Sequence, residues 1–392
     1  MALRSMRRLS AVAAKARNHV VPDELIEHNG GLLEYSVVYT DRALNHMSSP
    51  FQEVMLDLHG SLTRAYNAAS CVLVPGSGTY AMEAAARAFG SGDVVVVRNG
   101  YFSYRWSQIF EAMGKPESQM HVLKARFGEA VTPAPIEEVV ATIRATKPSL
   151  VAAPHVETSA GIILPDDYVR DLASAAHEVG AVMCLDGVAS GTAWIDMGDL
   201  GVDCYVTAPQ KGWSGPAAVG VAMLSESAVE IAKAQAPSSF TIDLAKWHQV
   251  MGAYLAGGHM YHATMPTDAI RAFRDVVFET ENFGLDKAQD ACWRLGMGVR
   301  DVLKDRGFKS VAADGFEAPG VAVVFAPDAS YAGKFKDASS LQIAAGVPLM
   351  IGEPDTYQSF RIGLFGLDKL KDVDLTVANF QTALDTVIHH AA

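Results

Sequence analysis

The sequence has few cysteines, and nothing in their spacing indicates a disulfide framework or a metal site. Its 392 residues include four cysteines, and none forms a Cys-x-x-Cys pair. Three of them, Cys71, Cys184 and Cys204, lie in apolar runs, where a cysteine behaves as a small buried hydrophobic residue in a reducing compartment. The twelve histidines include no His-Glu-x-x-His pattern and no paired metal spacing. We therefore predict that the protein holds no metal.

Long hydrophobic runs and an excess of positive charge are also missing. No apolar run approaches the ~20 residues that a membrane span requires. The chain has 44 acidic and 32 basic residues, for a formal charge of −12, which argues against nucleic acid and acidic membranes as partners. Residues 1–10 are basic, but no hydrophobic segment follows them. A secretory signal is therefore disfavoured, whereas a mitochondrial presequence stays open by composition. We expect a cytoplasmic protein.

The pattern of apolar residues predicts an α/β protein. Apolar residues make up 49% of the chain and charged residues 19%, as in globular proteins with a sizeable core. Between about residues 72 and 224, short apolar runs alternate with amphipathic stretches, which predicts a mainly parallel sheet with helices on both faces. The expected strands are 72–74, 94–97, 150–153 and 181–185, and the expected helices are 80–89, 135–146 and 166–179.

The pattern changes after about residue 276, where helices and strands come in blocks. We expect a helix over 282–306, strands over 321–325 and 359–364, and a final helix near 373–389, together forming a smaller α+β domain. The length of the chain also favours two domains. We predict an N-terminal arm or entrance segment (1–44), a large domain (45–275) and a small C-terminal domain (276–392).

Lys211 is the most informative residue of the sequence. It lies in a turn rich in glycine and proline between the apolar runs 204–207 and 219–224, where burial would lower its pKa and make its amine nucleophilic. Asp186 ends another apolar run 25 residues earlier. A lysine that holds an aldehyde and a carboxylate that keeps a pyridine nitrogen protonated are what pyridoxal phosphate requires. A lysine that caps a turn and an aspartate at a helix start are the structural alternatives.

The segment Gly76-Ser77-Gly78-Thr79 runs from an expected strand into an expected helix. Glycines allow the backbone to approach a ligand, and the first N–H groups of a helix attract phosphate. The same residues match the Gly-x-Gly-x-x-Ala fingerprint of dinucleotide sites. A nicotinamide site would need an acid at the end of the next strand, and Asp93 precedes that strand instead. We therefore rank a nicotinamide-dependent oxidoreductase low.

With this segment, Asp186 and Lys211 in this order, the chain resembles fold-type I enzymes that use pyridoxal 5′-phosphate. More narrowly, it resembles the class V aminotransferases of the alanine–glyoxylate and serine–glyoxylate (serine–pyruvate) group, from about Asn45 to the C-terminus. The resemblance implies a large domain with a mainly parallel seven-stranded sheet and a smaller α+β domain. It also implies a homodimer with active sites at the subunit interface, and small amino acids and 2-oxo acids as substrates.

The resemblance implies a role for each residue that matches a family motif. Lys211 and Asp186 would be catalytic, and both would also bind the cofactor. Ser77, Gly78, Thr79 and Gln210 would bind its phosphate, and Tyr261 and Thr264 would reach the phosphate of the neighbouring subunit. Phe102 and Val188 would lie against opposite faces of the ring, with Thr158 at the 3′ oxygen. Arg361 would bind the substrate carboxylate. Lys211 would move the proton, so that His155 and His262 are expected to be structural.

The chain departs from the family at residues 36–42. Many relatives have Gly-Pro-Gly-Pro near this place, whereas Tyr39 and Arg42 add bulk and charge here. An aminophosphonate donor is therefore worth testing, and an ammonia-releasing β-elimination lyase stays open as the alternative function. A catalytically silent ligand-binding protein on the same fold is a weaker alternative. Arg42 and Arg105 are weaker candidates for an anion site, and we expect a surface ion pair for each of them.

Overall fold

The computed structural model describes residues 20–391, so the basic segment 1–10 lies outside the described residues. A seven-stranded sheet forms the centre of the molecule, with strands in the order β1-β11-β10-β9-β6-β2-β3. Only β11 runs antiparallel to its neighbours, β1 and β10, and the other pairings are parallel. The strands are β1 (Ser70–Pro75), β2 (Val94–Arg98), β3 (Met120–Lys124), β6 (Leu150–Pro154), β9 (Val182–Asp186), β10 (Cys204–Thr207) and β11 (Val219–Leu224).

Helices cover both faces of this sheet. Successive side chains of a strand point to opposite faces, and every residue of β2, β6, β9 and β11 is buried. The predicted α/β class and mainly parallel sheet are confirmed. The helices between residues 20 and 266 are α2 (Asp23–His28), α3 (Ser49–Tyr66), α4 (Gly78–Phe89), α5 (Tyr101–Ala112), α6 (Ile136–Thr146), α7 (Asp166–Glu178), α8 (Met197–Leu200), α9 (Glu226–Ala234) and α10 (Leu244–Leu255), with a 3-10 turn, η1, at Glu117–Gln119.

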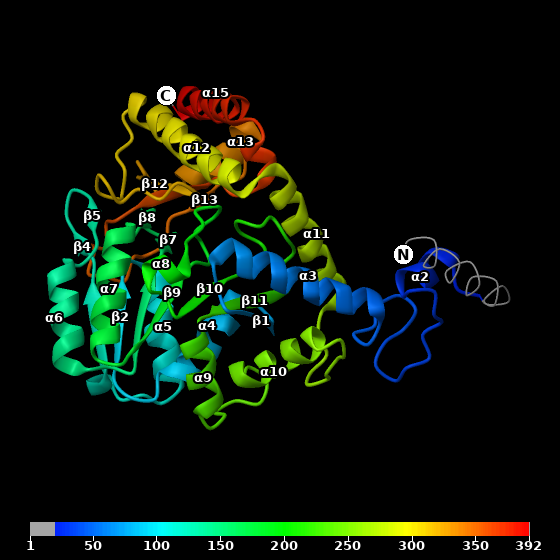
Figure 1. Cartoon of the computed structure of the whole chain (residues 1–392). Helices are drawn as coiled ribbons and strands as arrows, with labels where there is room; N and C mark the ends of the chain where they lie inside the picture. Colours follow the sequence, from blue (N-terminus) through cyan, green and yellow to red (C-terminus); the bar gives the residue numbers. More distant parts are fainter. Residues whose placement is uncertain (1–19, 392) are drawn as a thin grey trace.

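The C-terminal part packs helices against a small antiparallel sheet and lies over one end of the large sheet (Figure 1). Its own hydrophobic cluster joins α12 and α15 to the sheet through side chains such as Leu295, Phe360 and Leu384. The elements are α11 (Thr267–Phe283), α12 (Leu285–Asp305), β12 (Val321–Phe325), α13 (Tyr331–Ser339), β13 (Ala344–Ala345), β14 (Ser359–Gly363), α14 (Leu367–Leu370) and α15 (Val373–Ala391).

The start of α12 differs from the prediction by three residues. The helix expected over 282–306 begins at Leu285, because Gly284 adopts a φ of +105° that a continuous helix does not allow, and this residue separates α12 from α11. α11 itself runs without a break across residues 275 and 276. The proposed domain limits stay a prediction.

A third hydrophobic cluster joins the two parts of the chain. It combines residues that follow the large-sheet strands, such as Ala125 and Ile162, with Val323 and Leu349 from the C-terminal part. Two short hairpins, β4 (Arg126–Phe127) with β5 (Val131–Thr132) and β7 (Val156–Glu157) with β8 (Ile162–Ile163), lie in this region. The C-terminal part is therefore packed directly onto the loops at one edge of the large sheet.

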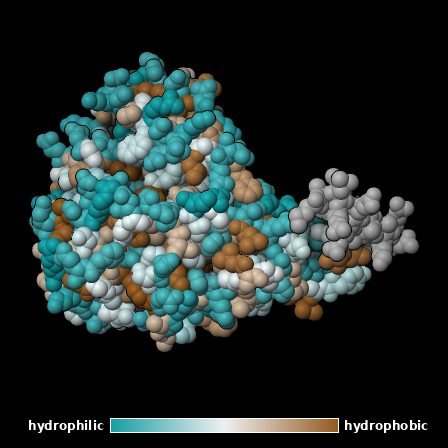
Figure 2. Space-filling view, viewed as in Figure 1, coloured by the Kyte–Doolittle hydropathy of each residue, from teal (hydrophilic) through white to brown (hydrophobic). Residues whose placement is uncertain are grey.

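The N-terminal arm projects from the body, with α2 at its end (Figure 1). Figure 2 shows hydrophobic atoms gathered on this arm beside a mostly hydrophilic surface. Val20, Leu32, Tyr35 and Val37 are exposed on it. Within residues 20–391, none of the helices combines the length and the apolar character needed to cross a bilayer. The four cysteines are buried and free, as predicted.

We predict that Gly187→Ala destabilises the protein. A Cβ at Gly187 would lie 1.9 Å from Cζ of the buried Tyr205 ring, and overpacking of this kind costs about 1–3 kcal/mol. Chemical denaturation should show this loss in the free energy of unfolding. The control is Gly252→Ala in the middle of α10, where a Cβ meets nothing within 4 Å and should stabilise the helix by about 0.5–1 kcal/mol. Equal effects of the two substitutions would contradict the packing described here.

Candidate active site

Five loops meet at one edge of the large sheet. β1, β2, β6, β9 and β10 are mutually parallel, since β1 and β10 both pair antiparallel to β11. Their carboxyl ends therefore face the same edge, which is where ligands bind in open α/β sheets. The residues that follow these ends are the predicted phosphate loop, Phe102, the segment of Thr158, Asp186 and Lys211.

Asp186 is the last residue of β9 and is only 7% exposed. It pairs with Pro154 of β6 and Val206 of β10, and its Oδ1 accepts a hydrogen bond from Val188 N–H at 3.0 Å. Burial raises the pKa of Asp186 to about 7, helped by the negative charge of Glu157, whereas the Val188 hydrogen bond and the positive charge of Arg105 oppose the shift. A carboxylate in this setting favours a cationic partner.

Lys211 follows β10 in the loop that leads to β11, and it is half-buried. Burial, together with the nearby positive charge of Arg361, lowers its pKa. Its Nζ lies 5.6 Å from the ring centroid of Phe365, a residue of the C-terminal part. The loop passes so close to the chain at Gly191 that a Cβ at Gly212 would lie 1.9 Å from the Gly191 carbonyl oxygen. Tight packing of two loops thus places an amine with a lowered pKa at the sheet edge.

The first turn of α4 forms the predicted phosphate loop. Ser77 is the N-cap residue, but its side chain makes no capping hydrogen bond, so the helix start keeps donors for an anion. A Cβ at Gly78 would lie 2.7 Å from Cγ2 of Val188, which places the loop directly against the segment after Asp186. Thr79 Oγ1 accepts a hydrogen bond from Arg105 Nη1 at 2.9 Å.

Two guanidinium groups lie near the ring of Phe102. Cζ of Arg361 is 5.6 Å from the Phe102 ring centroid, and Cζ of Arg105 is 5.8 Å from it. Arg361 Nε donates to the carbonyl of Ala345 at 2.9 Å rather than to a carboxylate. Burial lowers the pKa of Arg361, and the charge of Glu157 opposes this shift. The surface ion pair expected for Arg105 is wrong, because this half-buried side chain bonds to Thr79 across the site.

Other predicted site residues make no such contacts with this group. Gln210 is exposed and Thr158 is half-buried. Tyr261 and Thr264 are also exposed, and their side-chain oxygens lie 3.2 Å apart, within hydrogen-bonding distance of each other. Tyr261 and Thr264 are expected to bind the phosphate in a neighbouring subunit. The roles of all four residues stay predictions.

Both histidines weighed for catalysis make the hydrogen bonds expected of structural residues. His155 Nδ1 lies 2.7 Å from Ser190 Oγ, and His262 Nε2 lies 2.8 Å from the Phe240 carbonyl oxygen. Burial lowers the pKa of His155 to about 4, so its ring is neutral at physiological pH.

The sequence did not identify Glu157 as part of the site, although it directly precedes Thr158, a predicted site residue. This carboxylate is fully buried and accepts hydrogen bonds from Phe102 N–H and Ser103 N–H. The signal that could have indicated it is an acidic residue within a short run that follows a buried strand. Arg105 was noticed only as a weak anion-site candidate, since its partner lies 26 residues away in another helix.

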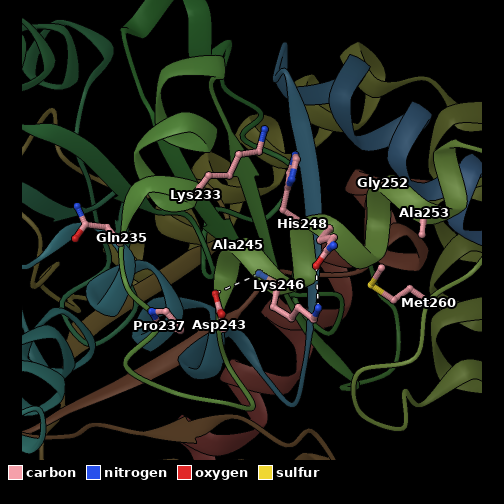
Figure 3. Close-up of a pocket in the computed structure, with 11 residues that line it drawn as sticks. Lys233, Gln235, Pro237, Asp243, Ala245, Lys246, His248, Gly252, Ala253 and Met260 are labelled. Atoms are coloured by element: carbon pink, nitrogen blue, oxygen red, sulfur yellow. Dashed lines mark hydrogen bonds between the residues drawn. The ribbon is translucent and has the colours of Figure 1, made fainter.

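A large hollow lies elsewhere, on the surface between α9 and α10 (Figure 3). Its volume is about 700 Å³, and Lys233, Lys246 and His248 line it. Lys246 Nζ donates to Gln249 within its wall. This hollow contains none of the predicted site residues and no strand end, so we do not take it as the active site.

Comparison with known proteins agrees with this geometry. The chain matches the aminotransferase class V family over residues 19–318. It is 29% identical to a 2-aminoethylphosphonate–pyruvate transaminase of Burkholderia ambifaria, covering 88% of this chain and 89% of that protein. A transaminase of the same description from Pseudomonas putida is 27% identical over 83% of this chain and 85% of its own length.

Solved structures share the fold. A ureidoglycine–glyoxylate aminotransferase from Bacillus subtilis superposes with a TM-score of 0.74 at 19% identity, covering 95% of this chain and 91% of that structure. An alanine–glyoxylate aminotransferase from Nostoc sp. gives a TM-score of 0.73 at 21% identity, covering 92% of each chain. The predicted fold type and family resemblance are confirmed, and the chain belongs to the class V aminotransferases.

Proposed function

We propose that this chain transfers an amino group from a small amino acid or aminophosphonate to a 2-oxo acid such as pyruvate or glyoxylate, with pyridoxal phosphate held between Lys211 and Asp186. The observation that carries the proposal is that two groups lie at the same edge of the sheet: the buried carboxylate of Asp186 and the half-buried amine of Lys211, whose pKa is lowered. Membership of the class V aminotransferases supports it. The elimination alternative is not favoured, because the relatives named above are transaminases.

The residues at the sheet edge fit pyridoxal phosphate. The uncapped first turn of α4 offers donors for a phosphate, and the raised pKa of Asp186 indicates a site for a protonated ring nitrogen. Val188 and Phe102 would hold the ring from its two faces. When bound, the cofactor supplies an aldehyde and an electron-withdrawing ring that stabilises negative charge at the substrate α-carbon.

The proton transfer is assigned to Lys211. With its pKa lowered, a larger fraction of its amine is neutral, so it could remove the proton from the α-carbon of the donor and deliver it to the aldehyde carbon that the cofactor would supply. Arg361 would orient the anionic group of the donor through a bidentate pair. Asp186 would hold the ring nitrogen in its protonated form.

An aminophosphonate donor is supported by two features. The relatives named above act, by their descriptions, on 2-aminoethylphosphonate and pyruvate. In addition, Arg105 and Arg361 lie near Phe102, and the hydrogen bonds that they donate go to Thr79 and to the Ala345 carbonyl, not to a carboxylate. A doubly charged phosphonate suits an arginine with a free fork of donors. Pyruvate is then the proposed acceptor.

We predict that Lys211→Ala abolishes conversion of 2-aminoethylphosphonate and pyruvate to alanine, with a loss of at least about 10³-fold, because positioned acid–base groups contribute about 10²–10⁴-fold. Alanine formation and ammonia release would be measured together. The control is Lys233→Ala, which removes a lysine of the hollow in Figure 3 and should leave the rate unchanged. Full activity of Lys211→Ala would contradict the assignment, and ammonia release without alanine would indicate the lyase.

Asp186→Asn should stabilise the cofactor-free protein at alkaline pH. The folded state holds the pKa of Asp186 near 7, above its ordinary value of 3.8, so the stability that it contributes is present below about pH 4 and lost as the pH rises to 7. At pH 8 the variant should therefore be more stable by a few kcal/mol, at about 1.4 kcal/mol per pKa unit. Denaturant unfolding from pH 5 to 8 measures this difference. If the difference in unfolding free energy between the variant and the wild type stays constant with pH, the pKa of Asp186 is not raised in the folded protein.

A further inference from the structure

Glu157 is a buried acid that the proposed reaction does not use. It is the last residue of β7, and it is 0% exposed. Its two carboxylate oxygens accept five hydrogen bonds, all from amide N–H or hydroxyl groups of three residues: Phe102 N–H at 3.2 Å, Ser103 N–H at 2.8 Å, Ser103 Oγ at 2.7 Å, Ser159 N–H at 3.0 Å and Ser159 Oγ at 2.6 Å. No basic side chain is among these donors, so the negative charge is stabilised by dipoles alone.

The donors belong mainly to the first turn of α5. An α-helix leaves its first N–H groups without partners in the helix, and a negative charge there also meets the positive end of the helix dipole. Glu157 takes the N–H groups of Phe102 and Ser103, and Ser159 Oγ accepts the N–H of Tyr101 at 2.9 Å. Three consecutive N–H groups of α5 are thus fixed to one short segment.

The fit between this segment and α5 is tight. A Cβ at Gly100 would lie 2.1 Å from Ser159 Oγ and 2.7 Å from Glu157 Cγ, so only glycine allows the approach. Ser103 Oγ also accepts the N–H groups of Asn99 and Gly100. The backbone on both sides of Phe102 is therefore held against the carboxylate, which fixes the position from which the Phe102 side chain extends.

We infer that Glu157 is a positioning residue for the cofactor. It holds the first turn of α5 and thereby places Phe102 so that one face of its ring lies against the cofactor ring. The inference rests on the proposed function, since it assigns Phe102 to the ring.

A double-mutant cycle on cofactor affinity tests the inference. The dissociation constant of pyridoxal phosphate would be measured by equilibrium dialysis for the wild type, Glu157→Gln, Phe102→Leu and the double variant. We expect each single substitution to weaken binding about tenfold or more, and the double variant to bind no more weakly than the weaker single one, because Glu157 acts through Phe102. The inference would be overturned if the two substitutions weakened binding by factors that multiply in the double variant, or if Glu157→Gln bound the cofactor as tightly as the wild type.

Asp203→Asn is the matched control for a general loss of stability. Asp203 is 8% exposed and, like Glu157, accepts several hydrogen bonds, including Met183 N–H at 2.9 Å and Ser225 Oγ at 3.2 Å. It precedes β10, at the opposite edge of the sheet. Its substitution should lower the free energy of unfolding, leave the cofactor affinity unchanged, and combine additively with Phe102→Leu. Coupling between Asp203 and Phe102 as strong as that of Glu157 would contradict a specific role.

Ser103→Ala provides the milder variant if Glu157→Gln fails to fold. It removes one of the five hydrogen bonds to Glu157 and keeps the charge. When it is combined with Phe102→Leu, it should weaken cofactor binding no further than Phe102→Leu alone does. An effect that multiplies with that of Phe102→Leu would overturn the inference. If the wild type binds no pyridoxal phosphate, the proposed function fails and the inference fails with it. Wild-type binding with independent effects of the two substitutions would overturn the inference alone.

Discussion

The burial of one carboxylate, that of Asp186, is the constraint on which the site depends. Placing a charge inside a sheet covered on both faces is costly unless a partner compensates it. Val188 N–H donates a hydrogen bond to this carboxylate, and the Trp106 side chain and the positive charge of Arg105 also favour its charged form. Glu157 acts in the opposite direction. The pKa of about 7 expresses this balance, and a protonated ring nitrogen would complete it.

Close backbone approaches bring the other groups to this carboxylate. Gly78 allows the start of α4 to contact Val188, and Gly212 allows the lysine loop to contact the chain at Gly191. A side chain at either position would push the two loops apart. The C-terminal part then contributes Arg361 and Phe365, which approach Phe102 and Lys211. The site is thus assembled from residues almost 300 positions apart, and its geometry depends on packing between the two parts of the chain.

Much of the fold could be predicted because its signals are local. The four valines of β2 and the apolar runs of β6 and β9 indicate strands buried on both faces, and Lys211 and Asp186 stand out because they interrupt or end such runs. The start of α12 at Leu285 was missed, since a glycine with positive φ leaves little trace in the apolar pattern. The expected helix began at residue 282, inside α11, because helical residues lie on both sides of Gly284.

The roles of Arg105 and Glu157 could not be predicted, because they depend on tertiary contacts. Arg105 bonds to a threonine of another helix, and Glu157 meets donors more than 50 residues earlier in the chain. A sequence pattern indicates that such a residue is charged and near an apolar run. It does not indicate which helix start lies beside it, and that neighbour decides whether the charge is a surface group or part of the site.

The central claim is that one amine, that of Lys211, holds the cofactor opposite Asp186. Borohydride reduction of the protein purified with pyridoxal phosphate, followed by digestion and mass spectrometry of the peptides, tests it most directly. The account predicts a single phosphopyridoxyl group on the peptide that contains Lys211. A label on another lysine, such as Lys233 or Lys246 of the surface hollow, or no label on any peptide, would contradict it.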